Sequence, residues 1–500
     1  MRPCDVTRRA LVALALTVVC ATCAAPLHAQ SKLDRGVAPT PGPSPAIRVP
    51  VWTHAKLANG AELVVTPKHD LPLVSVSINF VGGSYAFEPA GKVGTAAFAA
   101  QMLSEGTAAR TADQFSEAQQ LLGTSINASV TGESGSIGFT ALADKLGPAL
   151  DLVAEMLLHP TFPTASLERI RGRTLVQLKQ AKDQPNAIAA NVFSRTVFGT
   201  EHPYGRVMTE ATVQAVTRDD IVAFHATYFR PGRSVITVAG DVDPAAVKTL
   251  FERAFALWAA GGERPAWQYP PAPVAPATRI YLVDKPGAAQ SVFAIGLPGP
   301  PRSTPDYFAL QVMNTLLGGL FQSRLNHDIR EVHGFSYGVN SSFGFGRGPG
   351  AFRAGGGVIT AKTDSALIEF MMEFRGVQGG IPFTDDEIQQ GKESLVQSLP
   401  KRFGSVNAVA GSVSSLFTQD LPQTYYRDYP ANVRAVTRED LVRVAKKYID
   451  LQHLDIVIVA DRSAVEAPLA ATGIAPIVLL DLEGRPVASG SAVPTGAGGR

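Results

Sequence analysis

The alternation of apolar and polar residues predicts a mixture of strands and helices in the first half of the chain. In Leu73–Phe80, apolar side chains occupy every second position, which is the pattern of a half-buried strand. A shorter strand is expected at Ala61–Thr66, and Ser125–Thr131 and Ser136–Ala141 are expected to pair around a glycine-containing turn. Where the apolar period lengthens, helices are predicted at residues 94–106, 111–122, 145–158 and 164–182.

A repeat at an offset of about 220 residues indicates two copies of one structural unit. Val213–Val222 (V-Q-A-V-T-R-D-D-I-V) recurs as Val433–Val442 (V-R-A-V-T-R-E-D-L-V), and both copies contain a Thr-x-x-Asp helix start. Each copy leads to an apolar strand, at Ser234–Gly240 and at Asp455–Ala460. We therefore predict an α+β fold made of two homologous α/β sandwich-like domains.

Proline-rich segments set the expected domain boundaries, because such segments form extended linkers rather than cores. The tail contains a possible strand at Pro476–Asp481 and is expected to be disordered from Ala488 onward. The predicted segments are a linker at 30–50, an N-terminal domain at 51–260, a second linker at 261–276, a C-terminal domain at 277–465 and the tail at 466–500.

A targeting segment is expected at the start of the chain. Basic residues are followed by an apolar stretch from Ala10 to Ala25, which is typical of a secretory signal. We predict that residues 1–29 are a cleaved signal peptide and that the mature protein lies in the periplasm. The alternatives are an uncleaved anchor and a lipid attached to Cys20 or Cys23.

Composition restricts the chemistry and the partners of the chain. The sequence is 45% hydrophobic and 18% charged with a net charge of +2, which gives no indication of nucleic-acid binding. All three cysteines lie in the predicted signal peptide, so the mature chain would hold no disulfide and no thiolate metal site. No later stretch is long and apolar enough to span a membrane.

The stretch Gly94–Thr107 (G-T-A-A-F-A-A-Q-M-L-S-E-G-T) carries a resemblance to a known family. It resembles the active-site helix of the insulinase/pitrilysin family of zinc peptidases, the inverted zincins, which carries H-x-x-E-H within a pattern like G-L-A-H-F-L-E-H-M-L-F-x-G-T. The resemblance extends over roughly residues 51–465. It implies two duplicated domains that face each other in a clam-shell arrangement.

The residues that carry the chemistry of this family are replaced in the chain. The two zinc-binding histidines correspond to Ala97 and Gln101, and the catalytic glutamate between them corresponds to Ala100. The third zinc ligand of the family, a glutamate on a later helix, corresponds to Gln177. Alanine has no ligand atom, and a neutral amide is a poor ligand for Zn²⁺. We therefore expect no catalytic residue at this degenerate site, and no metal or cofactor in this chain.

The second half keeps a motif that the resemblance connects with substrate. Ser323–Tyr337 (S-R-L-N-H-D-I-R-E-V-H-G-F-S-Y) is similar to the family segment S-R-L-x-x-x-[IL]-R-E-x-x-G-x-x-Y, whose arginine and tyrosine hydrogen-bond substrate near the zinc of the other half. These two residues correspond to Arg330 and Tyr337, and both side chains can stabilise an oxyanion. The alternative is that Arg330 only complements a helix C-terminus and Tyr337 only begins a strand.

Two further candidates arise from the sequence. In the family, the matching edge strand pairs with the substrate backbone, which makes Asn127 and Ala128 predicted peptide contacts; an ordinary hairpin strand is the alternative. His327, Glu331 and His333 lie close together in the sequence, but no further ligand is evident, and we expect a solvated helix end rather than a metal site.

These residues together predict a catalytically incomplete subunit. In two-chain members of the family, one chain supplies zinc and H-x-x-E-H, and the other chain supplies the arginine and the tyrosine. The resemblance implies that this chain binds extended peptides and contributes to proteolysis only in a heterodimer with an H-x-x-E-H-bearing partner, which holds the zinc. The alternatives are a peptide-binding or assembly scaffold without hydrolysis, and an autonomous zinc metalloendopeptidase, against which the replaced residues argue.

Overall fold

The structure is a computed structural model that describes residues 48–264 and 269–487. The predicted signal peptide, with all three cysteines, lies outside the described residues, as do most of the first linker, part of the second and the end of the tail. Within the described ranges, no helix combines the length and the apolar composition that a membrane crossing requires.

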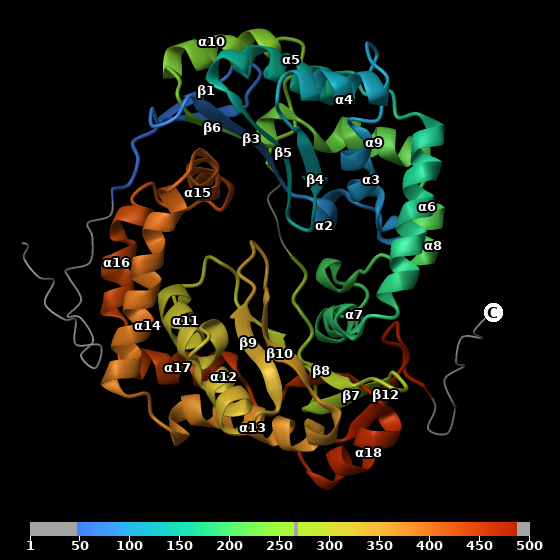
Figure 1. Cartoon of the computed structure of the whole chain (residues 1–500), viewed down its shortest axis with the longest axis vertical. Helices are drawn as coiled ribbons and strands as arrows, with labels where there is room; N and C mark the ends of the chain where they lie inside the picture. Colours follow the sequence, from blue (N-terminus) through green and yellow to red (C-terminus); the bar gives the residue numbers. More distant parts are fainter. Residues whose placement is uncertain (1–47, 265–268, 488–500) are drawn as a thin grey trace, which may run out of the picture. The chain divides into compact units, whose positions relative to one another are not determined.

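The first half of the chain builds a six-stranded mixed sheet in the order β1-β2-β6-β3-β5-β4 (Figure 1). Strand β6 is buried along its whole length, because it lies between a parallel neighbour, β2, and an antiparallel one, β3. The strands predicted from the alternating pattern are confirmed. The strands are β1 (Thr53–Lys56), β2 (Glu62–Pro67), β3 (Leu73–Val81), β4 (Asn127–Val130), β5 (Ser134–Leu142) and β6 (Ser234–Gly240).

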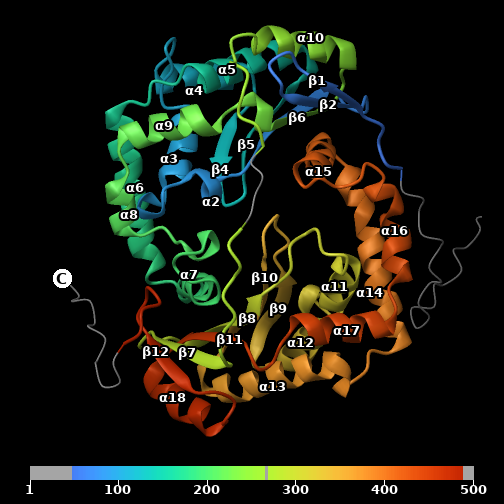
Figure 2. The ribbon, with the colours of Figure 1, turned by 180° about the vertical axis from the view of Figure 1, so that it is seen from behind.

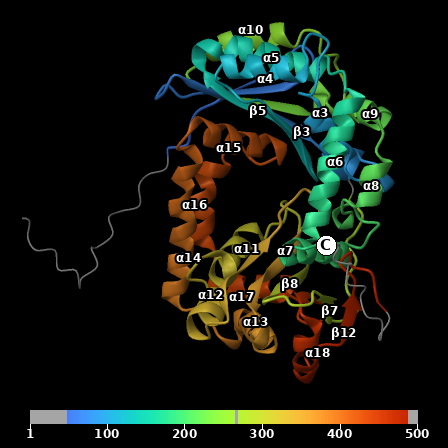
Figure 3. The same cartoon turned by 45° about the vertical axis from the view of Figure 1, so that its right-hand side comes forward.

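The helices of this half include the four that the sequence predicts, which are α3 to α6. Helices α5 and α10 pack on the sheet (Figure 3), and α3 packs beside α9 and beside the edge strand β4 (Figure 1). The helices are α2 (Ser84–Phe87), α3 (Thr95–Met102), α4 (Ala112–Leu121), α5 (Leu146–Leu158), α6 (Thr164–Ala181), α7 (Pro185–Phe198), α8 (Glu210–Ala215), α9 (Arg218–Tyr228) and α10 (Pro244–Ala254).

The second half builds another six-stranded sheet, in the order β12-β7-β11-β8-β10-β9. The central strand β11 again lies between a parallel neighbour, β7, and an antiparallel one, β8, which confirms the predicted duplication. The strand expected in the tail is β12, and it joins this sheet beside β7. The strands are β7 (Arg279–Asp284), β8 (Gln290–Pro298), β9 (Ser336–Phe343), β10 (Ala351–Ile359), β11 (Asp455–Ala460) and β12 (Ile477–Leu480).

Helices surround the second sheet as they surround the first. The repeated helix starts form as expected, because Thr217 and Thr437 each make a capping box with the aspartate three residues later, Asp220 and Asp440. The helices are α11 (Tyr307–Asn314), α12 (Arg324–Asn326), α13 (Thr363–Arg375), α14 (Asp385–Ser398), α15 (Val406–Thr418), α16 (Tyr425–Ala435), α17 (Arg438–Tyr448) and α18 (Arg462–Ala471).

The two halves exchange one helix each. Helix α7 of the first half packs on strands β8 and β11 of the second sheet, and α15 of the second half packs on β3 and β6 of the first (Figure 2). Buried apolar residues of α7, such as Ile188 and Val192, share a core with Val457 and Val459 of β11. Each sheet is therefore covered partly by the other half of the chain, and apolar burial stabilises the contact between the halves.

Asp455 is an ionisable group in the centre of the second sheet. It is 3% exposed, and burial raises the pKa of its carboxyl to about 6 although the Tyr281 hydroxyl and Arg279 favour the charged form. The folded state therefore retains a proton that the unfolded chain releases near pH 4. The free energy of unfolding therefore falls as the pH rises from about 4 to about 6. Above pH 6 it is about 3 kcal/mol lower than it would be if the pKa of Asp455 were unshifted.

We expect Asp455→Asn to raise the free energy of unfolding by about 2 kcal/mol at pH 8 and to change it little at pH 4, because the amide carries no charge in either state. Urea denaturation at the two pH values measures the difference. Asp183→Asn is the matched control, because the Asp183 side chain is 84% exposed. An equal loss of stability at both pH values would contradict a raised pKa of Asp455 in the folded state.

Candidate functional site

Helix α3 is held in place at its first turn. It begins after Gly94, whose φ of +120° is accessible to glycine. The carboxylate of Glu88 accepts hydrogen bonds from the backbone N–H groups of Gly94 and Ala96, both at 2.8 Å. Burial raises the pKa of Glu88, and these N–H bonds oppose that effect. The helix that would carry a zinc motif is thus well formed in this chain.

The four positions that correspond to the zinc chemistry lie on α3 and α6. Ala97 is half-buried and Gln101 is exposed one turn later on the same face, whereas Ala100 is 2% exposed. Gln177 is exposed on α6, which contacts α3. None of these four side chains offers an imidazole or a carboxylate.

A guanidinium occupies the contact between the two helices. Arg173 lies on α6 one turn before Gln177, and its Nη2 donates to Oε1 of Gln101 at 3.0 Å. A cation placed here repels a metal ion, whereas the family places an anionic ligand one turn further along the same helix. Arg173 is therefore a site residue that the sequence comparison did not single out.

Arg330 lies on a short π-helical segment, η6 (His327–Val332), that follows α12. The segment ends at Gly334, which has a φ of +65° and donates its N–H to the carbonyl of Arg330. The guanidinium forms an ion pair with Glu331 at 2.8 Å and lies 4.2 Å from the ring centroid of Phe321. That ring is 67% exposed, whereas the Arg330 side chain is 30% exposed and therefore partly buried.

Tyr337 is the second residue of β9, the edge strand of the second sheet. It is 90% exposed. The helix end and the strand start that the sequence suggested as local roles of Arg330 and Tyr337 are both present. These roles leave Tyr337 fully accessible to a ligand and Arg330 partly accessible, because 30% of the Arg330 side chain is exposed.

Asn127 and Ala128 lie on β4, the edge strand of the first sheet. Asn127 is exposed and Ala128 is half-buried, and in the described part of the chain β4 pairs with β5 alone. The backbone groups on its other side are therefore free to pair with an extended peptide. The edge position, which the sequence left open, is thus present.

The β4–β5 hairpin of the first sheet and the β9–β10 hairpin of the second are hydrogen-bonded to each other through their turns. Glu133, in the turn between β4 and β5, accepts hydrogen bonds from the backbone N–H groups of Arg347 at 2.8 Å and Gly348 at 3.1 Å, in the turn between β9 and β10. The Tyr204 hydroxyl also donates to this carboxylate. Burial, and then this carboxylate, raise the pKa of Tyr204 well above its usual range. The contact fixes one edge hairpin against the other.

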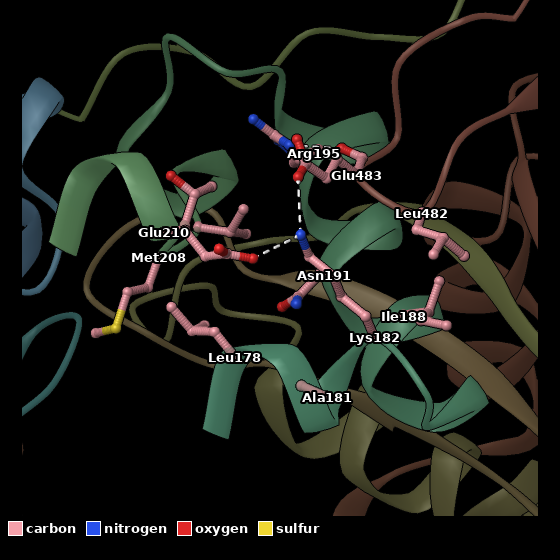
Figure 4. Close-up of a pocket in the computed structure, with 12 residues that line it drawn as sticks. Leu178, Ala181, Lys182, Ile188, Asn191, Arg195, Met208, Glu210, Leu482 and Glu483 are labelled. Carbon is pink, nitrogen blue, oxygen red and sulfur yellow. Dashed lines mark hydrogen bonds and ion pairs between the residues drawn. The ribbon is translucent and has the colours of Figure 1, made fainter. Parts of the chain in front are cut away.

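A small pocket lies where α6, α7 and α8 meet the segment after β12 (Figure 4). Lys182 spans it, with its Nζ at 2.9 Å from Glu210 and 3.4 Å from Glu483. The cavity measures about 50 Å³, which is enough for a few water molecules and too small for a peptide. We interpret it as a packing contact, in which Lys182 links the first half of the chain to the tail.

Family models match both halves of the chain. The model described as insulinase (peptidase family M16) covers residues 63–209, and the model described as peptidase M16 inactive domain covers residues 215–395. An uncharacterized zinc protease of Mycobacterium bovis is 31% identical over 277 residues, which are 54% of this chain and 63% of that protein. The match thus spans less than two thirds of that relative.

Two further likenesses extend over more of the chain. An uncharacterized zinc protease of Bacillus subtilis, YmxG, is 25% identical over 351 residues, which are 70% of this chain and 84% of that protein. The crystal structure of a peptidase M16 inactive domain from Pseudomonas fluorescens superposes with a TM-score of 0.75 and 25% identity, over 82% of this chain and 98% of that one. With both halves matched in sequence and in fold, the chain belongs to the insulinase family, peptidase family M16.

Proposed function

We propose that this chain is a catalytically incomplete insulinase-family subunit. It binds extended peptides and supplies Arg330 and Tyr337 to a zinc-bearing partner in a heterodimeric metallopeptidase. The zinc of the reaction belongs to the partner, and this chain holds no catalytic metal of its own.

The contrast between the two candidate sites carries the proposal. Where the family binds zinc, the amide of Gln101 accepts a hydrogen bond from Arg173, and none of the four replaced side chains is an imidazole or a carboxylate. In the second half, Tyr337 is 90% exposed and the Arg330 side chain is 30% exposed, so a ligand can reach the hydroxyl fully and the guanidinium in part. A chain that has lost the reactive half of a site and kept the substrate-holding half suits a complementing subunit.

The open edge of β4 supports the peptide-binding part of the proposal. An extended peptide paired with Asn127 and Ala128 would gain backbone hydrogen bonds that do not depend on its side chains. Such binding is broad in sequence and selective for unfolded substrates. We place the heterodimer in the periplasm, on the basis of the signal peptide predicted at residues 1–29.

Mixing two purified chains tests this function. The protein is assayed on unstructured fluorogenic peptides alone, and then with a homologue from the same genome that retains H-x-x-E-H. We expect hydrolysis only in the mixture, with a 1:1 complex visible by light scattering. Peptide binding by this chain without hydrolysis in any mixture would favour the scaffold alternative. Hydrolysis by this chain alone would favour an autonomous peptidase and overturn the proposal.

A further inference from the structure

The π-helical segment η6 brings together two residues that an α-helix would separate. The backbone N–H of His333 donates to the carbonyl of Asp328 at 3.0 Å, a bond that spans five residues. In an α-helix, residues five apart point roughly 140° away from each other. The wider turn instead places Nε2 of His333 at 3.5 Å from Oδ1 of Asp328. Such π-turns occur frequently at functional sites.

A third side chain reaches the same point from a different helix. Glu369 lies on α13, which packs against η6, and its Oε1 is 3.7 Å from Nε2 of His333. One ligand atom from each of Asp328, His333 and Glu369 lies within 4.8 Å of the other two. The His333 ring stacks on Phe335, with centroids 4.9 Å apart and planes inclined by 22°. This stacking holds the imidazole in its orientation.

The carboxylates in the cluster of Asp328, His333 and Glu369 are not neutralised by a neighbouring lysine or arginine in an ion pair that the structure shows among the described residues. The carboxylates of Asp328 and Glu369 are largely buried, with 21% and 15% of their side chains exposed. Oδ2 of Asp328 and Oε2 of Glu373, one turn further along α13, are buried without a hydrogen-bond partner.

The arginines of η6 and of the preceding helix α12 are engaged with other carboxylates. Arg330, on η6, forms an ion pair with Glu331 at 2.8 Å. Arg324 donates to both carboxylate oxygens of Glu387, at 2.9 and 3.0 Å, and to two backbone carbonyls. Among the described residues, His333 is the side chain whose nitrogen faces both Asp328 and Glu369. A divalent ion would neutralise the carboxylates and give the unpartnered oxygen of Asp328 a partner.

We propose that Asp328, His333 and Glu369 form a binding site for one divalent transition-metal ion, with Zn²⁺ as the best match. One imidazole nitrogen and two carboxylate oxygens favour such an ion, whereas Mg²⁺ and Ca²⁺ prefer oxygen ligands only. The ion would link η6 to α13 and so fix the segment that carries Arg330. This site is separate from the degenerate site on α3 and α6, and it departs from the expectation of a metal-free chain.

Calorimetric titration of the purified protein with ZnCl₂ tests the site. We expect one ion per chain, at least tenfold weaker binding in His333→Asn and in Glu369→Gln, and no change in His327→Asn. His327 is the matched control, because it is exposed on the same segment. Zinc should also raise the melting temperature of the wild type but not of His333→Asn. Unaltered zinc binding in both ligand variants, or equally strong binding of Mg²⁺, would overturn the proposal.

A second variant separates this site from the degenerate one. The double variant Gln101→Ala and Gln177→Ala should bind zinc as the wild type does. Loss of zinc in this variant, with retention in His333→Asn, would place the ion between α3 and α6. That result would overturn both the new site and the proposal that the catalytic zinc belongs to the partner. Absence of zinc from every protein would overturn the new site alone.

Discussion

Arg330→Ala is expected to lower kcat/KM of the assembled heterodimer by about 10²-fold, with little change in the affinity between the subunits. Under the proposed function, the guanidinium of Arg330 would donate to the peptide oxygen that becomes negative when water attacks the scissile carbonyl. Removal of one such donor from an oxyanion site typically costs 10² to 10³ in rate. The effect is expected mainly in kcat, because the charge on that oxygen develops in the transition state.

Two further variants show whether the loss reflects the donor itself. Arg330→Lys keeps the charge but loses the planar fork, so it should recover only part of the rate. Arg427→Ala removes an arginine whose side chain is 71% exposed on α16, and it should leave the rate unchanged. Tyr337→Phe should lower kcat by about tenfold or more, because only the hydroxyl is removed. Normal rates in both Arg330→Ala and Tyr337→Phe would show that these residues do not touch the reacting peptide.

Much of the architecture could be predicted because local patterns and the repeat agree. The alternation in Leu73–Phe80 and the apolar run in Asp455–Ala460 correspond to β3 and β11, and the Thr-x-x-Asp starts correspond to capping boxes. These features depend on residues near one another in the sequence, where periodicity and capping chemistry act directly.

The exchange of α7 and α15 could not be predicted in the same way. An amphipathic helix shows that it has an apolar face, but not which sheet covers that face. The same limit applies to Arg173, whose hydrogen bond to Gln101 joins residues on two helices 72 positions apart. Only the packing of α3 on α6 reveals that a guanidinium lies beside the degenerate site.

The cluster around His333 illustrates a second limit. The sequence places His327, Glu331 and His333 close together, and from it we expected a solvated helix end rather than a metal site. In the structure the π-turn brings Asp328 to His333, and Glu369 reaches the same point from α13. His327 is exposed and has no place in the group. A single π-turn therefore brings together side chains that α-helical spacing does not indicate.

Restoring the family residues is expected to create a zinc site between α3 and α6. The variant with Ala97→His, Ala100→Glu, Gln101→His and Gln177→Glu would place two imidazoles on one face of α3 and a carboxylate on α6, which is a three-ligand set for Zn²⁺. The helices already meet at this point, as the hydrogen bond from Arg173 to residue 101 shows. Backbone rearrangement is therefore not needed.

The measurement is zinc affinity in a His333→Asn background, so that only the new site is counted. We expect one ion per chain at micromolar affinity or better, against none in the background protein. Arg173→Gln added to the restored site should tighten binding roughly tenfold, because a unit charge about 5 Å from Zn²⁺ costs about 1–2 kcal/mol even in a solvent-like dielectric. If neither restored protein binds zinc while both remain folded by circular dichroism, the correspondence of Gln177 to the third ligand is wrong. If the restored site binds zinc, the loss of metal in this chain is explained by its side chains and not by its backbone.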